Sequence, residues 1–152
     1  MTRKRSKRKV RPIDFLSVYR LTGRNSQFTP DEQAEVMVTT RKSFQAFIDR
    51  TAVRQDYDQL ATAVSVAMVA AERIDVQVVD VCVPGVAAIG RAYERHIKTG
   101  QWGLDGPAKA EIADALDIYE QMMALMTGGQ MHNAMVEVMQ RQADGNVIEV
   151  GA

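Results

Sequence analysis

Residues 60–71 (Leu-Ala-Thr-Ala-Val-Ser-Val-Ala-Met-Val-Ala-Ala) constrain the fold of this chain more than any other stretch. They are apolar nearly all round, interrupted only by Thr62 and Ser65. A helix of this character is normally surrounded by other helices. Charged residues bound the stretch on both sides, and it is shorter than the roughly 20 apolar residues that a membrane-spanning helix requires. The stretch therefore predicts the central helix of a small all-α bundle.

Charge divides the chain into unequal parts, although the formal net charge of its 152 residues is zero. Residues 1–12 hold seven of the nineteen basic side chains and no acidic one. Such asymmetry is typical of a basic tail on an acidic body. The first twelve residues contain too few apolar groups to order themselves. We therefore expect a disordered basic arm (1–12), a helical bundle domain (13–142) and a loose C-terminal tail (143–152).

The hydrophobic pattern predicts four to five antiparallel helices joined by short loops. Thr29-Pro-Asp-Glu32 has the features of a helix start with a capping box, and this helix should run to about residue 54. Residues 76–98 keep helical spacing, and we expect that helix to be broken or kinked near Pro84-Gly85. A strand over residues 76–83 stays open as an alternative, because the segment is rich in valine. The next helix is expected to end at Gly128-Gly129, and the last helix is expected to cover about residues 130–142.

The segment Lys98-Thr-Gly-Gln-Trp-Gly-Leu-Asp-Gly-Pro107 predicts a tight connection between two helices. Gly100 suits a left-handed helix cap, and Asp105 can cap the helix that follows. Trp102 is expected to pack against a helix end, because a large aromatic side chain gains much from burial.

Two parts of the chain carry a resemblance to known proteins. One is this turn with the helix after it, and the other is the earlier segment Asp58-Gln-Leu-Ala-Thr-Ala-Val-Ser-Val-Ala-Met-Val-Ala-Ala-Glu-Arg73. The chain resembles a group of short, uncharacterised helical proteins from proteobacterial phages, prophages and plasmids. The resemblance covers roughly residues 58–127, and the Thr-Gly-x-Trp-Gly turn is its most distinctive part. It implies a mobile genetic element as the context and no activity or catalytic residue.

The basic arm is the candidate nucleic-acid-binding site. Several phosphates could be neutralised there with release of counterions. No aromatic residue interleaves the basic run, so base stacking is not indicated. An unbound solubilising tail and, in a eukaryotic cell, a nuclear localisation signal are the alternatives. The candidate residues are Arg3, Lys4, Arg5, Lys7, Arg8, Lys9 and Arg11.

Two faces of the body could instead contact a protein. A strip of acidic residues on one predicted helix and the turn before it could mimic DNA phosphates, although a solvated helix face is the simpler interpretation. Dense methionines could form an adaptable binding surface, although core filling or a homodimer seam is the simpler role. The acidic residues are Asp105, Glu111, Asp114, Asp117 and Glu120, and the methionines are Met122, Met123, Met126, Met131, Met135 and Met139.

Catalysis, metal binding and cofactor binding find little support in the sequence. His96 and His132 fall on different predicted helices, and Cys82 lies on an apolar stripe where a buried thiol is expected. The glycines of the turn follow no strand, so they make no nucleotide-binding motif. The single cysteine and the absence of an apolar leader favour the cytoplasm, without a membrane. The sequence thus predicts a non-enzymatic regulatory or accessory protein that contacts nucleic acid, with a protein-directed inhibitor or adaptor as the alternative.

Overall fold

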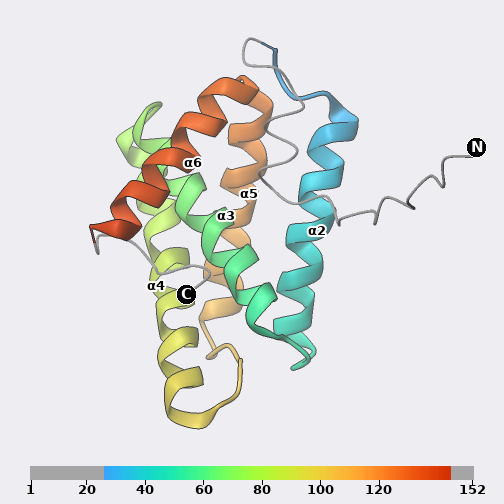
Figure 1. Ribbon diagram of the computed structural model, residues 1–152, viewed down its shortest axis with the longest axis vertical. Coiled ribbons are helices and arrows are strands. Elements are labelled where there is room, and N and C mark those ends of the chain that lie inside the picture. Colours follow the sequence, from blue (N-terminus) through green and yellow to red (C-terminus); the bar gives the residue numbers. More distant parts are fainter. Residues whose placement is uncertain (1–25, 145–152) are drawn as a thin grey trace, which may run out of the picture.

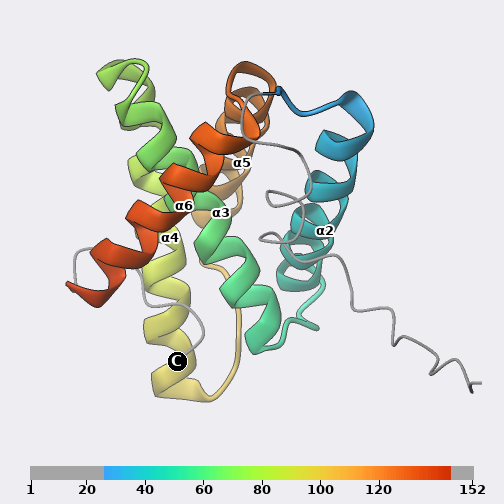
Figure 2. The same cartoon turned by 45° about the horizontal axis from the view of Figure 1, so that its top comes forward.

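The computed structural model describes residues 26–144, and this part of the chain folds into one bundle of five helices (Figure 1). Successive helices from α2 to α5 reverse direction, and α6 lies obliquely across the others (Figure 2). The all-α prediction is confirmed, and the predicted arm and most of the tail fall outside the described residues. The helices are α2 (Pro30–Ile48), α3 (Arg54–Glu72), α4 (Val76–Thr99), α5 (Ala108–Leu125) and α6 (Gly128–Ala143).

The apolar stretch that begins at Leu60 lies at the centre of this bundle, as predicted. It belongs to α3, which packs against α2, α4, α5 and α6. The side chains of Leu60, Val64 and Val66 have no exposed surface. An all-round apolar helix is stable here because each of its faces meets another helix.

Three helix ends are set by local interactions, and those at Thr29 and Gly100 were predicted from the sequence. The Thr29 hydroxyl accepts a hydrogen bond from the Glu32 N–H at 3.2 Å, and the Glu32 carboxylate accepts one from the Thr29 N–H at 3.3 Å. Asp75 caps α4 by accepting from the Gln77 N–H at 2.9 Å. Gly100 ends α4 with a φ of 73°, a left-handed conformation that glycine adopts without a Cβ clash.

The predicted end of the first helix was wrong. α2 stops at Ile48 rather than near residue 54, and Arg50 then takes a left-handed conformation with a φ of 60°. The Arg50 N–H donates to the Phe47 carbonyl at 3.3 Å, and the Thr51 N–H donates to the Ala46 carbonyl at 2.9 Å. This pair of hydrogen bonds is the Schellman motif, which usually places glycine where Arg50 stands. The sequence offered no glycine to mark the end.

The helix is not broken at Pro84, because α4 is helical from Val76 to Thr99. Gly85 serves a different purpose: it lies against α5, where Glu111 and Ala115 approach its backbone closely. The strand alternative for residues 76–83 does not occur. By length and composition alone α4 would suffice to cross a membrane, but in this fold it packs against α3 and α5.

The boundary between the last two helices differs from the prediction as well. α5 ends at Leu125, and Gly128 belongs to the first turn of α6. Thr127 forms a capping box with Gln130, so the helix starts at the two glycines that were expected to stop its predecessor. Five of the six methionines noted in the sequence are buried in the core, and Met139 is exposed.

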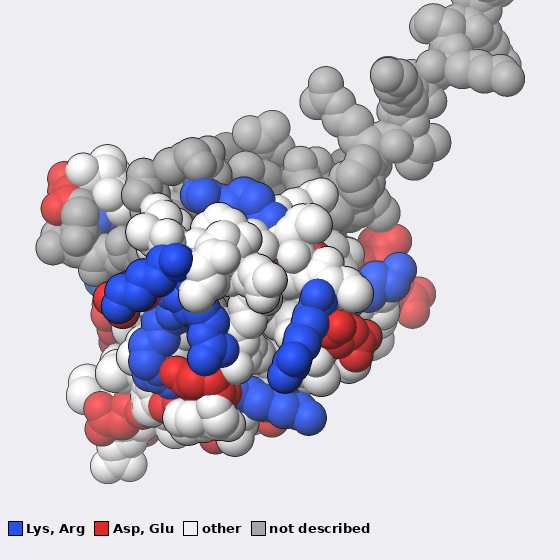
Figure 3. All heavy atoms as spheres, turned by 90° about the horizontal axis from the view of Figure 1, so that it is seen from below, with Lys and Arg blue, Asp and Glu red and all other residues white. Residues whose placement is uncertain are grey.

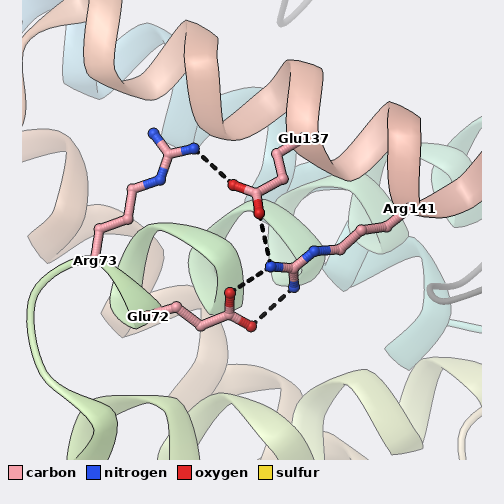
Figure 4. A network of polar contacts seen from close by, with 4 residues as sticks. All are labelled: Glu72, Arg73, Glu137 and Arg141. Carbon is pink, nitrogen blue, oxygen red and sulfur yellow. Dashed lines mark hydrogen bonds and ion pairs between the residues drawn. The ribbon is translucent and has the colours of Figure 1, made fainter.

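An arginine–glutamate network fastens α6 to the end of α3 (Figure 4). Glu137 accepts hydrogen bonds from Arg73 at 2.6 Å and from Arg141 at 2.8 Å. Arg141 also pairs with Glu72 through both of its terminal nitrogens. The two arginines hold the pKa of the Glu137 carboxyl below its usual value. These carboxylates are therefore neutralised within the molecule.

Candidate functional site

A hollow of about 790 Å³ opens at the end of the bundle where α4 turns back into α5. Figure 3 views the molecule from this end and shows Lys and Arg side chains gathered around an uncharged centre. Three separate segments supply the cationic side chains of its wall, so we call it the basic hollow. Its lining comprises Phe47, Ile48, Arg50 and Ala52 from α2 and the following loop, Arg95 from α4, residues 99–106, and Lys109 from α5.

Arg50 reaches the hollow from the Schellman turn that ends α2. A side chain in the left-handed region costs about 1–2 kcal/mol relative to ordinary helical backbone. Glycine would avoid that cost, yet the chain places an arginine there, exposed and without an ion pair to any residue between 26 and 144. The Schellman turn accounts for the backbone conformation. The exposed guanidinium on the wall of the hollow, unpaired within residues 26–144, makes Arg50 a candidate binding residue.

Arg95 lies over the loop between α4 and α5. Its Nη1 donates to the Leu104 carbonyl at 3.1 Å, and this bond holds the guanidinium beside the hollow. The backbone N–H groups of Trp102, Gly103 and Leu104 donate to no other residue of the described part. The loop therefore brings a cation and several free backbone donors to the same wall.

Lys109 stands in the first turn of α5, which is the positive end of that helix dipole. Its ammonium makes no ion pair within the described part of the chain. The wall of the hollow contains one carboxylate, that of Asp105. This carboxylate accepts hydrogen bonds from the Arg91 guanidinium at 2.6 Å and from the Ala108 N–H at 3.1 Å. The hydrogen bond from Arg91 holds the pKa of the Asp105 carboxyl below its usual value. Asp105 thus stays ionised but is matched by its own arginine.

Trp102 anchors the loop through an aromatic cluster. Its ring stacks on His96 with centroids 3.7 Å apart and on Tyr57 with centroids 4.8 Å apart. Phe47 meets it edge-on at 6.2 Å. The predicted packing of Trp102 against a helix end is thus confirmed, and the cluster ties the loop to α2, α3 and α4. A loop held this firmly presents its cations and N–H groups in fixed positions.

Other arginines of the body contrast with Arg50. Arg41 bridges Asp117 and Glu120 at 3.2 and 3.1 Å, and Arg91 bridges Asp105 and Glu111 at 2.6 and 2.8 Å. These two arginines therefore contact four of the five residues proposed as an acidic strip. The two positive charges offset only part of the five negative ones, so the strip is partly paired and stays acidic.

The remaining candidate residues do not assemble into a site. His96 lies on α4 and His132 on α6, and Cys82 is buried, with its thiol pKa raised to about 11 by that burial. No group of three or more His, Cys, Asp or Glu side chains suited to a metal ion occurs within residues 26–144. The seven arm residues, Arg3 to Arg11, lie outside the described residues.

Sequence reasoning missed the basic hollow because its cations are far apart in the chain. Arg95 and Lys109 flank a glycine-rich turn, and that proximity was the one signal available. Arg50 was assigned to the interior of a helix that was expected to continue to residue 54. Only the early end of α2 brings Arg50 to the same wall as the turn.

Comparisons with protein-family models, with curated proteins and with solved structures give no match for this chain.

Proposed function

We propose that this chain is a non-enzymatic accessory protein that binds nucleic acid through phosphate contacts at the basic hollow, assisted by the basic arm. The observation that carries the proposal is the hollow itself: Arg50, Arg95 and Lys109 come from three segments and face one space. Arginine and lysine side chains and backbone N–H groups are the usual partners of nucleic-acid phosphates. A mobile genetic element, which the sequence resemblance implies, is a context in which such proteins serve.

The distribution of ion pairs supports this choice of surface. Arg41, Arg73, Arg91 and Arg141 are each paired with carboxylates, whereas Arg50 and Lys109 have no ion pair within residues 26–144. Lys42 is also unpaired in this part of the chain but does not line the hollow. Unmatched cations attract an external anion without first breaking an internal pair. The arm would add up to seven further cations to the same partner.

The alternative function, a protein-directed inhibitor or adaptor, finds less support in its original form. Internal arginines bridge the acidic strip, and most of the dense methionines fill the core. Exposed apolar side chains remain on several helices, and the first half of α4 carries three of them, Val76, Val81 and Val83. These apolar side chains are the observation that favours the alternative.

A matched pair of lysine substitutions tests the proposal. Lys109→Gln removes a cation from the hollow, and Lys42→Gln removes an exposed cation from α2 that does not line it. Binding of labelled duplex and single-stranded DNA is measured by fluorescence anisotropy at several salt concentrations. Lys109→Gln should weaken binding and reduce the slope of log affinity against log salt by about 0.9, whereas Lys42→Gln should change neither.

A full-length variant with all seven arm cations changed to glutamine separates the arm from the hollow. Seven lost phosphate contacts would reduce the salt slope by about 6 on duplex DNA. If this variant loses all binding and Lys109→Gln loses none, the arm alone binds and the hollow has no part. If wild-type protein binds no DNA at low salt, the proposal is wrong and the protein-partner alternative takes its place.

A further inference from the structure

We propose that the basic hollow holds a phosphate monoester, the group found at the end of a nucleic-acid strand or on a free nucleotide, rather than a backbone phosphodiester. The proposal builds on the nucleic-acid function above and specifies which phosphate the hollow selects. It rests on the volume of the hollow, its charge, its free backbone donors and the packing of Trp102.

The volume of the hollow restricts what can enter. About 790 Å³ lies within the range of sites for small ligands, which is roughly 300–1,000 Å³. A strand end or a single nucleotide fits such a space, whereas an intact double helix does not. The backbone of a duplex could touch only the rim, where it would leave the loop donors unused.

The charge of the hollow suits a dianion. A phosphate monoester carries about −1.5 to −2 charges at pH 7 and offers three acceptor oxygens. A backbone phosphodiester carries a single negative charge. The wall supplies three cationic side chains, and its one carboxylate, Asp105, is already bound by Arg91. Charge-assisted hydrogen bonds to the more highly charged group are the stronger ones.

The loop between α4 and α5 adds donors that need no side chain. The N–H groups of Trp102, Gly103 and Leu104 have no partner within residues 26–144. A Cβ at Gly103 would meet Arg95 at 3.6 Å, so the guanidinium lies directly beside this backbone. Free backbone N–H groups and a nearby helix N-terminus are both common partners of phosphate.

Trp102 does not offer a stacking platform for a base. His96 and Tyr57 both stack against its ring in near-parallel planes, at interplanar angles of 1° and 16°. Only the edge of the indole therefore lines the hollow, and neither face of the ring is free to stack on a base. Recognition then depends on the phosphate, and we expect little selectivity among bases.

The test uses the full chain and two single-stranded oligonucleotides of one sequence, with a 5′-phosphate or a 5′-hydroxyl and a label at the 3′ end. The phosphorylated strand should bind about tenfold more tightly, a difference equal to one charge-assisted hydrogen bond. Lys109→Gln should abolish that preference, and Lys42→Gln should preserve it. Arg50→Gly provides a second variant in the hollow.

Trp102, the single tryptophan of the chain, gives an independent readout in the same space. Inorganic phosphate and AMP should change its fluorescence, and adenosine should not. If AMP and phosphate bind while the two strands bind equally, the hollow takes the monoester of a free nucleotide.

Two results overturn the proposal. If both strands bind equally and neither phosphate nor AMP changes the Trp102 fluorescence, the monoester proposal is wrong. A loss of strand binding in Lys109→Gln would then still support nucleic-acid binding at the rim of the hollow. If the protein binds neither strand, the nucleic-acid function is wrong. In that case the monoester proposal holds only if phosphate and AMP still change the Trp102 fluorescence.

Discussion

Replacing Gly85 by alanine should destabilise the bundle, although alanine is normally the better helix former. A Cβ at Gly85 would lie 2.6 Å from the Ala115 Cβ and 2.9 Å from the Glu111 carbonyl oxygen. Neither atom can rotate away, since one is the first side-chain atom of an alanine and the other belongs to the backbone of α5. The substitution must therefore separate α4 from α5.

The expected magnitude follows from two opposing contributions. Overpacking a tight contact costs about 1–3 kcal/mol, and with both contacts under 3.0 Å we expect the upper part of that range. Exchange of glycine for alanine within a helix returns about 1 kcal/mol. The net loss should be about 1–2 kcal/mol, or roughly 2–8 °C in melting temperature.

Gly90 provides the matched control on the same helix. A Cβ there meets nothing within 4 Å, so Gly90→Ala should stabilise the protein by about 0.5–1 kcal/mol. Urea unfolding followed by far-UV circular dichroism measures both variants. Ala115→Gly removes the nearer contact, so this substitution should cost less in the Gly85→Ala protein than in wild type, where glycine inside α5 costs about 1 kcal/mol. If Gly85→Ala is as stable as wild type, the close approach of α4 and α5 is not real.

Three further predictions concern burial and charge. Val64→Asp places an unpaired charge at the centre of the bundle and should cost several kcal/mol, so a circular dichroism melt like that of wild type would contradict the position of α3. Because Arg91 lowers the folded pKa of Asp105, this carboxylate stabilises the fold above its unfolded pKa of about 4 and loses that effect as the pH falls through the folded value. Asp105→Asn should therefore be less stable than wild type at pH 7, and urea titrations at lower pH should show the difference shrinking, whereas a constant difference would exclude the ion pair. The Cys82 thiol, with its pKa raised to about 11, should react with a thiol reagent at pH 8 only after unfolding, and rapid reaction of the native protein would place it at the surface.

Local patterns were sufficient to predict much of the fold. The apolar stretch beginning at Leu60 predicted a surrounded helix, because such a surface is stable only when other helices cover it. The caps at Thr29 and Gly100 were predictable because they act within a few residues of the chain. The errors arose where distant residues decide the outcome. Gly85 resembles a helix breaker in sequence, yet its role is set by Ala115, thirty residues away.

The basic hollow was beyond prediction for the same reason. The sequence around Arg50 does not predict a left-handed conformation, because the usual glycine is missing and the helical pattern continues beyond residue 50. Its approach to Lys109 depends on how α2, α4 and α5 pack. The sequence therefore drew attention to the arm, whose basic residues are adjacent in the chain, and not to cations that only the fold brings together.

Arg50→Gly is the substitution that tests the basic hollow most directly, because stability and binding should change in opposite directions. Glycine relieves the left-handed strain at this position, so the urea midpoint of the variant should equal or exceed that of wild type. Its affinity for a 5′-phosphorylated strand, measured on the same samples at low salt, should fall about tenfold with the loss of one charged contact. An Arg50→Gly protein that is fully folded and binds the strand as tightly as wild type would show that the hollow is not the binding site.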